Sequence, residues 1–383
     1  MAAGTGAQAS AEAPVLIVAL AKRYGGIDTR VTAMARAFTQ AGRRCCVAAT
    51  AGAPLCAALT KAGLPVAASP YAPRDMRNIR WLADLARSMG AGVMDAHNPQ
   101  SYFMGMTAAA LARIPGRLCT IHLNFRTFAS GRLKAAGLDA LVRFSSRLGA
   151  DFLTVSNDGA DYLEQIGIPR SRITVTTNAL EVPVGQGTDL RQAFGFAADD
   201  FLVVVPARLE PQKGHRYLLD ALRMARASGR PIRCLLAGDG AERPSLERMV
   251  REAGLEEQVM FLGFREDAVE LIRGADLMCL PSVLEGLPYA ALEAASVGTP
   301  LLLTSVGGIP DHFQHGVTAR LVDARDPEGL ARELHWCAVH RQELDQQAQA
   351  ARCMVARDFG VDKMMREIRS GYAQAMARSA LRA

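Results

Sequence analysis

Two glutamates, Glu285 and Glu293, bracket a Gly-Leu-Pro turn that stands immediately before a helical pattern. The residues from Pro288 onward favour a helix with proline in its first turn, which puts Glu285 in the preceding loop and Glu293 about one and a half turns in. The first N–H groups of a helix have no intrahelical partner and attract anions. The stretch is therefore a candidate phosphate site, although two glutamates at this spacing also arise by chance in helix-rich proteins.

Loops that follow strand-like apolar runs in the same half of the chain carry cations and glycines. Arg208 and Lys213 come soon after the run Phe201–Val205, and two cations at the carboxyl end of a strand suit a diphosphate. Gly238–Gly240 and Gly307–Gly308 follow two further runs, where glycine lets bare backbone approach a ligand. Each loop alone is a weak signal, but their shared position after successive strands predicts a single binding edge.

Two histidines and a glycine pair hold equivalent positions in the first half. His97 and His122 each stand just past a strand-like run, and Asn98 follows His97. Residues at strand carboxyl ends line the ligand crevice of such sheets, so these side chains are candidates for substrate contact. The alternative for each histidine is a hydrogen-bonded loop cap. Gly25–Gly26 follows the first run and permits close backbone approach, but the spacing of a dinucleotide fingerprint is absent.

These residues can form one site only if a sheet brings the ends of its strands together. The chain has the pattern of such a sheet, because short apolar runs alternate with helical patterns. The runs of the first half are Val15–Leu20, Cys45–Ala49, Gly92–Ala96, Leu118–Ile121 and Phe152–Val155. Those of the second half are Phe201–Val205, Cys234–Ala237, Val259–Leu262, Leu277–Leu280, Leu301–Thr304 and Ala319–Val322. The helical patterns include a segment starting near Thr29, Ile79–Met89 and Leu133–Leu148. This alternation predicts an α/β protein with mostly parallel sheets.

The length of 383 residues predicts two domains of similar size. A stretch rich in Pro and Gly around Glu181–Leu190 interrupts the alternation and marks the linker. We predict a frayed tail over residues 1–13, a first Rossmann-like domain over 14–183, a second over 184–355 and a C-terminal helical segment over 356–383. Two such domains place the natural active site in a central cleft between them.

Composition narrows the class of protein. Half of the residues are hydrophobic and 21% are charged, which is typical of a soluble globular chain, and no apolar run reaches the length of a membrane span. The first thirteen residues lack the basic start and apolar centre of a signal peptide, so we predict a cytoplasmic protein. Eight cysteines stand without metal-ligand spacing and are expected to be small buried side chains in a reducing compartment.

Positive charge is concentrated in the first half. Residues 1–183 hold 20 Lys and Arg against 11 Asp and Glu, whereas the remainder is slightly acidic. A basic half indicates a surface for nucleic acid, anionic lipid or a phosphate-bearing substrate, or a diffuse positive surface with no partner. The amphipathic segment Arg132–Arg147 could lie on an anionic membrane, but an ordinary surface helix is the favoured interpretation.

Together these residues resemble one family. Arg208 with Lys213-Gly214, Gly238-Asp239-Gly240, the Glu285-Gly286-Leu287-Pro288 to Glu293 stretch and Gly307-Gly308 resemble the C-terminal domain of retaining GT-B glycosyltransferases, specifically glycosyltransferase family 4. The first half agrees through Gly25-Gly26, His97, Val155-Ser156 and Asn178, so the resemblance extends from about residue 14 to nearly the end.

The resemblance implies a role for each matching position. Arg208 and Lys213 would bind the diphosphate of a nucleotide-sugar donor, Glu285 would lie near the donor sugar, and Glu293 would hydrogen-bond the ribose. The residues it implies for donor binding are Gly25, Gly26, Arg208, Lys213, Gly238, Gly286, Leu287, Pro288 and Glu293. His97, Glu285, Arg208 and Lys213 are the catalytic candidates, and His122 and Asn98 are candidates on the acceptor side.

The chemistry agrees with this reading, because breaking a glycosyl–phosphate bond leaves negative charge that fixed cations and a helix N-terminus stabilise without a metal. We therefore expect a GT-B fold whose final helices cross back to the first domain. We expect a retaining, metal-independent transfer from a nucleotide-sugar, with UDP favoured, to a glycan or lipid-linked acceptor in cell-surface glycan synthesis. Peripheral contact with an anionic membrane is part of this hypothesis, and a nucleic-acid partner is not.

Departures from the family pattern leave the acceptor and subfamily open. Asn178 is followed by Ala179 where the family usually has Gly, and Asp311 and Ala319 stand where Glu and Gly are common. The alternatives are a nucleotide-sugar epimerase or phosphorylase with the same architecture, or a binding protein that has lost catalysis.

Overall fold

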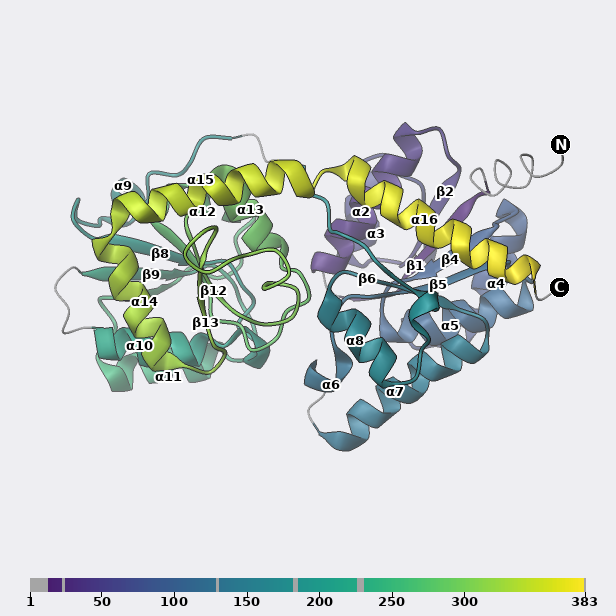
Figure 1. Cartoon of the computed structure of the whole chain (residues 1–383), viewed down its shortest axis with the longest axis horizontal. Helices are drawn as coiled ribbons and strands as arrows, with labels where there is room; N and C mark the ends of the chain where they lie inside the picture. The colour runs from purple at the N-terminus through teal and green to yellow at the C-terminus, as the bar shows by residue number, and fades with distance from the viewer. Residues whose placement is uncertain (1–12, 23–24, 129–130, 182–184, 226–230, 382–383) are drawn as a thin grey trace. The chain divides into compact units, whose positions relative to one another are not determined.

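The computed structural model describes residues 13–22, 25–128, 131–181, 185–225 and 231–381. It divides the chain into two compact units, one built from residues 1–179 with 361–383 and the other from 180–360 (Figure 1). The boundaries drawn from the sequence, after residues 183 and 355, lie a few residues away from these. Of the predicted tail, residues 1–12 lie outside the described part of the chain.

Unit 1 is built on a seven-stranded sheet in the order β3-β2-β1-β4-β5-β6-β7. Every pairing between neighbouring strands is parallel. The strands are β1 (Val15–Ala19), β2 (Cys45–Thr50), β3 (Val66–Ser69), β4 (Val93–Ala96), β5 (Gly116–Ile121), β6 (Asp151–Thr154) and β7 (Ile173–Val175). All carboxyl ends therefore meet at one edge, which is the edge that carries His97 and His122.

Helices cover both faces of this sheet. They are α2 (Gly26–Gln40), α3 (Pro54–Lys61), α4 (Arg77–Met89), α5 (Pro99–Leu111), α6 (Phe125–Phe128), α7 (Arg132–Arg147), α8 (Asn157–Gln165), α16 (Val361–Ala380) and the 3-10 turn η1 (Arg170–Arg172). Successive residues of β1 point to opposite faces, so Leu16 and Val18 join one core and Val15 and Ile17 the other. The first core contains α4 and α5, and the second contains α2 and α16.

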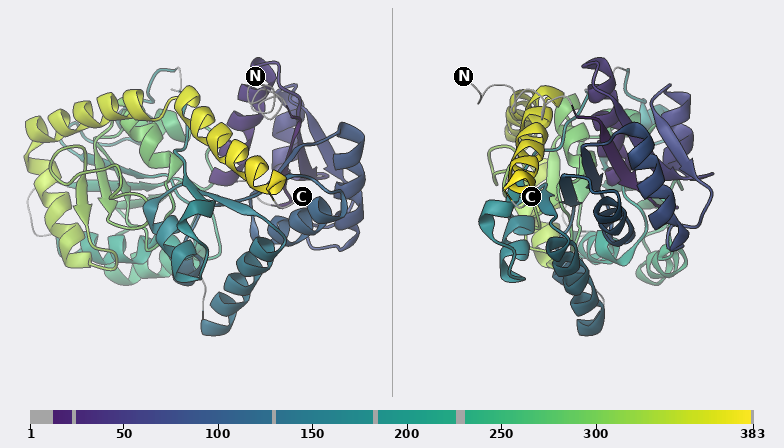
Figure 2. Two further views of the ribbon diagram at one scale, coloured as in Figure 1. Left: turned by 45° about the vertical axis from the view of Figure 1, so that its right-hand side comes forward. Right: turned by 90° about the vertical axis from the view of Figure 1, so that its right-hand side faces the viewer.

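The last helix, α16, belongs to unit 1 although it ends the chain (Figures 1 and 2). It packs against β5, β6, β7 and α2. Its buried stripe includes Met364, Ile368, Tyr372 and Ala375, which recur at helical spacing. The sheet of unit 1 therefore depends on a segment that is made last.

Unit 2 has a six-stranded parallel sheet in the order β10-β9-β8-β11-β12-β13. Its strands are β8 (Phe201–Val205), β9 (Ile232–Leu236), β10 (Val259–Phe261), β11 (Leu277–Leu280), β12 (Leu301–Thr304) and β13 (Arg320–Val322). Its helices are α9 (Leu190–Phe194), α10 (His215–Ala225), α11 (Arg243–Ala253), α12 (Ala268–Gly274), α13 (Tyr289–Val297), α14 (Pro327–Val339) and α15 (Arg341–Asp358), with the 3-10 turn η2 (Pro211–Lys213).

The predicted α/β class with two parallel-sheet, Rossmann-like units is confirmed. The apolar runs all correspond to strands, with ends shifted by one or two residues. Two strands were missed, β3 and β7. Both lie at the edges of the sheet and are short and partly exposed, so neither shows the continuous apolar run that marks a central strand.

Two further expectations concern membrane-spanning segments and the cysteines. Within the described segments, no helix is both long and apolar enough to cross a membrane. All eight cysteines are free thiols, and five of them are buried.

Candidate active site

The carboxyl edge of the unit 2 sheet brings together Lys213 and Glu285, which are 72 residues apart in sequence. Lys213 ends η2 after β8, and Glu285 follows β11, the strand beside β8 in the sheet. Lys213 Nζ donates to Glu285 Oε1 at 2.7 Å, and Ser282 Oγ donates to the same oxygen at 2.6 Å. Glu285 is buried, so the ion pair holds a cation at the edge where parallel sheets bind ligands.

Arg208 lies in the same loop as Lys213 but is held more loosely. Its side chain is about half exposed, and its guanidinium is 3.9 Å from the Glu210 carboxylate, which is too far for a strong hydrogen bond. The loop itself is anchored, because Leu209 is buried and its N–H donates to the carbonyl of Asp239 at 3.0 Å. Arg208 is therefore a half-exposed cation in a loop whose backbone is anchored.

The glycines of these loops have a packing role that the sequence did not reveal. A Cβ on Gly238 would collide with the carbonyl oxygen of Ala207, and one on Gly240 would collide with that of Leu209. In the same way, Gly214 leaves room for the carbonyl of Pro281, and it adopts a left-handed φ of 68°. The glycines thus let the loops after β8, β9 and β11 pack closely against one another. This packing role is separate from the close approach of a ligand that the sequence suggested.

The turn after Glu285 is supported by the loop after β12. Gly307 has φ 57°, and a Cβ there would collide with the carbonyl of Glu285, while the N–H of Gly308 donates to the carbonyl of Gly286 at 2.6 Å. Leu287 and Pro288 are buried. Pro288 is the N-cap of α13, one position before the helix, rather than part of its first turn as expected. Proline has no N–H to offer, so the first donors of the helix follow it.

Glu293 lies in the second turn of α13 and is partly buried. Burial raises the pKa of its carboxyl group. No hydrogen bond or ion pair to that carboxyl group occurs among the described residues, which leaves its oxygens to accept from a ligand.

In unit 1 the structure brings His97 and His122 into contact. His97 follows β4 and His122 follows β5, the neighbouring strand, and Nδ1 of His97 is 3.2 Å from Nε2 of His122. His97 is completely buried, and its Nε2 is 3.3 Å from Oδ2 of Asp95, an ion-pair distance without the alignment of a good hydrogen bond. His122 is partly exposed. Burial, with His97 and Arg30 nearby, holds the pKa of His122 well below 6.5.

The glycine pair does not form a loop of the expected length. The helix α2 begins at Gly26, not near Thr29, so Gly25 is its N-cap and Gly26 its first residue. The reason is Asp28, whose Oδ2 accepts from the N–H of Gly25 at 2.7 Å and closes the first turn. Burial raises the pKa of Asp28 and outweighs the lowering effect of the hydrogen bond from Gly25, so that the pKa is about 6.

Asn98 has a local structural role. It is the N-cap of α5, where its side chain accepts from the N–H of Ser101 at 3.0 Å and donates to the carbonyl of Leu20 at 3.3 Å. Ser156, from the Val155-Ser156 pair, similarly caps α8. Asn178 accepts from the fully buried Arg30 at 3.0 Å. These polar residues hold the carboxyl edge of the sheet in place.

Three residues that the sequence did not single out complete these clusters. Ser282 stands three positions before Glu285. Asp95 lies in β4 two positions before His97, and extended backbone points side chains two positions apart to the same side. That strand periodicity is a signal that could have identified Asp95. Tyr372 donates its hydroxyl to Asp95 Oδ2 at 2.8 Å and belongs to α16. No pattern in the sequence around Tyr372 indicates this contact.

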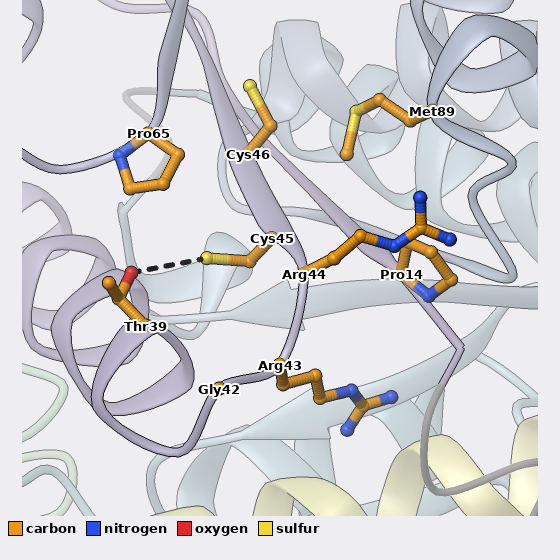
Figure 3. A pocket seen from close by; sticks show the side chains of 9 residues that line it. All are labelled: Pro14, Thr39, Gly42, Arg43, Arg44, Cys45, Cys46, Pro65 and Met89. Carbon is orange, nitrogen blue, oxygen red and sulfur yellow. Dashed lines mark hydrogen bonds between the residues drawn. The ribbon is translucent and has the colours of Figure 1, made fainter.

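A described cavity lies elsewhere in unit 1. It has a volume of about 450 Å³ and is found at the amino ends of β1, β2 and β3, the edge opposite His97 (Figure 3). Its lining residues are Pro14, Thr39, Gly42, Arg43, Arg44, Cys45, Cys46, Pro65 and Met89. None of the candidate residues lines it. Among the described residues, no group of three His, Cys, Asp or Glu side chains is arranged to hold a metal ion.

The basic helix α7 packs its apolar side into unit 1. Val142 is part of the core, Leu138 and Leu141 pack against it, and Phe144 stacks on Phe103 at 5.4 Å between ring centroids. Only the first turns of the helix extend away from the unit (Figure 2), and there Leu133 is 91% exposed. The packing agrees with an ordinary surface helix over most of its length.

Comparison with known proteins gives the family to which the two units belong. Residues 25–179 match the family model of the glycosyl transferase 4-like domain, and residues 187–353 match that of glycosyl transferases group 1. The chain is a GT-B glycosyltransferase. The two matches fall on unit 1 and unit 2 respectively, so both clusters described above belong to glycosyltransferase domains.

Individual relatives and solved structures agree with that class. The putative glycosyltransferase EpsD of Bacillus subtilis is 27% identical over 80% of this chain and 83% of its own length. An Escherichia coli UDP-Gal:alpha-D-GlcNAc-diphosphoundecaprenol alpha-1,3-galactosyltransferase is 24% identical over 61% of this chain and 63% of its own length. The structure of HepE from Anabaena in complex with UDP and glucose superposes with a TM-score of 0.81, at 22% identity over 94% of this chain and 98% of that one.

Proposed function

We propose that this glycosyltransferase moves a sugar from a UDP-sugar to a glycan or lipid-linked acceptor, with retention of anomeric configuration and without a metal ion. The observation that carries the proposal is the cluster in which the partly buried Lys213 contacts the buried Glu285, which also accepts from Ser282, at the carboxyl edge of the unit 2 sheet. Arg208 stands in the same loop as Lys213, and α13 begins four residues after Glu285.

The cluster suits departure of a nucleoside diphosphate. As the bond from the anomeric carbon to the phosphate oxygen breaks, negative charge grows on the diphosphate. Lys213, Arg208 and the N-terminus of α13 would stabilise that charge. Glu285 keeps Lys213 in place before the donor arrives, so little reorganisation is needed when it binds. Among the described residues, both side-chain hydrogen bonds to the Glu285 carboxylate fall on Oε1, and Oε2 would accept from a donor-sugar hydroxyl.

Glu293 completes the donor side of the proposal. Its carboxyl group is partly buried, its pKa is raised by burial, and it has no partner among the described residues. A ribose offers two hydroxyl donors, and hydrogen bonds from them would offset the cost of burying the carboxylate.

Relatives support the choice of uridine and the kind of acceptor. The Anabaena structure contains UDP, and the Escherichia coli relative is named for UDP-Gal and a diphosphoundecaprenol acceptor. A Salmonella typhimurium relative, 27% identical over 58% of this chain and 56% of its own length, is named as a putative colanic acid biosynthesis glycosyltransferase. We therefore favour an acceptor on the path to a cell-surface glycan.

On the acceptor side, we assign substrate contact to His122 rather than His97. His97 has no exposed surface and is enclosed by Asp95 and His122, whereas His122 is partly exposed at the same strand edge. Asn98 and the Gly25 cap would shape the wall of the acceptor site through backbone positions.

The same proposal puts the enzyme in the cytoplasm with unit 1 towards an anionic membrane surface. Exposed Arg132, Leu133 and Lys134 at the start of α7 form the best-suited patch, because an apolar tip between cations fits a lipid headgroup region. The rest of the apolar side of α7 is packed in the core, so contact would be peripheral.

Titration calorimetry with UDP, GDP and ADP and their sugars, with and without EDTA, tests the donor assignment. We expect selective binding of UDP that EDTA does not change. In Lys213→Met the affinity should fall about 10- to 100-fold, because one charge-assisted contact of about 1.5–3 kcal/mol is lost. Lys61→Met, an exposed lysine at the end of α3, is the matched control and should bind normally.

Product analysis separates the proposal from its alternatives. Transfer to an acceptor with retained anomeric configuration is expected, whereas donor isomerisation or phosphorolysis would indicate an epimerase or phosphorylase. Binding without turnover across a panel of acceptors would indicate a protein that has lost catalysis. Equal nucleotide binding by Lys213→Met and wild type would remove the donor site from this cluster.

A further inference from the structure

A chain of buried polar contacts runs from α16 to the partly exposed histidine of unit 1. Tyr372 donates its hydroxyl to Asp95 Oδ2 at 2.8 Å, and Thr120 donates to Asp95 Oδ1 at 2.8 Å. His97 Nε2 is 3.3 Å from Asp95 Oδ2, and His97 Nδ1 is 3.2 Å from His122 Nε2. One helix (α16), two strands (β4 and β5) and the loops after those two strands therefore contribute to one network.

Asp95 is the fixed charge of this network. It is completely buried, and burial alone would raise its pKa, but His97 and the hydroxyls of Thr120 and Tyr372 bring the pKa below its ordinary value. The group is thus an ionised carboxylate, which can only accept hydrogen bonds. The nitrogen that faces it, Nε2 of His97, must then carry a proton to avoid lone-pair repulsion.

The position of the proton on His97 determines which nitrogen of His122 carries a proton. When His97 carries a single proton and holds it on Nε2, its Nδ1 is unprotonated and accepts a hydrogen bond. Nε2 of His122, at 3.2 Å, must therefore donate, so His122 carries its proton on Nε2 and leaves Nδ1 as its acceptor nitrogen. His122 stays neutral because burial, His97 and Arg30 hold its pKa well below 6.5.

We propose that Asp95 and Tyr372 are positioning residues that set the tautomer of His122 through His97, so that Nδ1 of His122 accepts a hydrogen bond from the acceptor hydroxyl. This inference rests on the proposed function for the role of that hydroxyl. The tautomer chain itself is a property of the protein without substrate. His122 orients the hydroxyl and takes no proton from it.

Other charged groups that face the histidines do not replace Asp95. From α2, Asp28 interacts electrostatically with His97, but its carboxylate is engaged by the N–H of Gly25. Arg30, also from α2, is bound to Thr176, Thr177 and Asn178. From α16, Tyr372 contributes a hydroxyl and no charge near neutral pH, because burial raises its pKa well above 10. Asp95 is the group placed to select the tautomer.

Nitrogen-15 NMR of the full chain labelled at histidine tests the proposal without an activity assay. The seven histidines give few signals, and His97→Gln and His122→Gln variants assign the two that matter. In wild type, both should show the proton on Nε2 near neutral pH. In Asp95→Asn the charge that favours this tautomer is gone, so the signals of His97 and His122 should become a mixture or invert.

Kinetics give the matching functional result. Asp95→Asn should lower kcat for sugar transfer about tenfold, because the charge that selects the tautomer of His122 is lost, with KM for the donor unchanged. Tyr372→Phe should give a smaller loss of kcat and a smaller change in the nitrogen-15 signals of His97 and His122. The matched control is Tyr162→Phe, which removes another buried tyrosine hydroxyl that donates to a carboxylate, Asp139, outside the network. It should leave kcat and both histidine signals unchanged.

The outcomes separate the two levels of the proposal. A wild-type His122 protonated on Nδ1, or unchanged histidine signals in Asp95→Asn, would overturn the tautomer chain even in an active transferase. The predicted tautomers with no sugar transfer to any acceptor would support the chain and reject the proposed function. An equal loss of kcat in Tyr162→Phe and Tyr372→Phe would reduce Tyr372 to a packing residue.

Discussion

His215 shows how burial sets the charge of a single residue beside the donor cluster. It begins α10, two positions after Lys213, and neither of its ring nitrogens has a hydrogen-bond partner among the described residues. Burial, with a smaller contribution from Lys213, lowers its pKa from 6.5 to about 4. The folded protein therefore holds His215 neutral where the unfolded chain would protonate it.

This difference makes folding stability depend on pH. Between pH 6.5 and 4, His215 is protonated in the unfolded chain but not in the folded protein. The free energy of unfolding therefore falls as pH decreases through that range. From pH 7 to 4.5, wild type should lose about 2–3 kcal/mol more free energy of unfolding than His215→Leu. Denaturant unfolding of both proteins at the two pH values measures it.

Comparison between the two proteins removes the contribution of other groups. Asp28 acts with the opposite sign, because its pKa is raised to about 6 and its contribution is lost as pH increases through 6. That contribution is present in wild type and variant alike. Parallel stability curves for the two would mean that His215 is protonated in the folded protein or solvated.

At the scale of elements, the loop after β12 is what shapes the Glu285 turn. Gly307 has φ 57° and faces the carbonyl of Glu285, and Gly308 donates to the carbonyl of Gly286. The turn then leads directly into α13, whose N-terminus is part of the proposed donor site. A change in this loop should therefore reach donor binding without touching the donor.

Gly307→Ala tests this dependence. The left-handed φ alone costs about 1–2 kcal/mol for alanine, and the collision with the Glu285 carbonyl should bring the loss of stability to about 3 kcal/mol or more. UDP affinity should also fall. Gly316→Ala is the control, since Gly316 has a φ of 75° but its nearest neighbour is 3.8 Å away, at the end of Arg320. Thermal unfolding and calorimetry of both variants give the comparison, and equal losses would contradict the packing argument.

At the scale of the whole molecule, the chain leaves unit 1 after Ala179 and returns to it at Val361. The returning helix α16 places Met364, Ile368, Tyr372 and Ala375 in the core of unit 1. The Glu367 carboxylate on the same helix accepts a hydrogen bond from the N–H of Thr177 at 2.6 Å. Unit 1 therefore cannot complete its core until the end of the chain has been made.

A chain that stops at Gly360 should lose the cooperative unfolding of unit 1. Burial of the large side chains of α16 contributes roughly 6–10 kcal/mol, which is comparable to the whole stability of a domain. Unit 2 is complete without α16, so the truncated chain should still bind UDP. A chain that ends at Ala380 keeps the helix and is the control. Circular dichroism, limited proteolysis and calorimetry report the two units separately, and cooperative unfolding of both in the truncated chain would contradict this view.

The sequence by itself determined the α/β class, the central strands and the order of the loops that carry Arg208, Lys213, Glu285 and the two histidines. It could do so because central parallel strands are buried on both faces and read as continuous apolar runs, and because loops at their carboxyl ends share one edge. Edge strands β3 and β7 gave no such run. Gly26 lies in α2 rather than in the predicted loop, because Asp28 closes the first turn of the helix by accepting from the N–H of Gly25.

Only the tertiary structure decided which of these residues meet. The pairing of Lys213 with Glu285 follows from β8 and β11 being neighbours, and the burial of His97 behind His122 follows from the order of β4 and β5. The contact between Tyr372 and Asp95 joins residues 277 positions apart. Local patterns report burial and backbone preference within an element, whereas such contacts depend on strand order and on where the last helix returns.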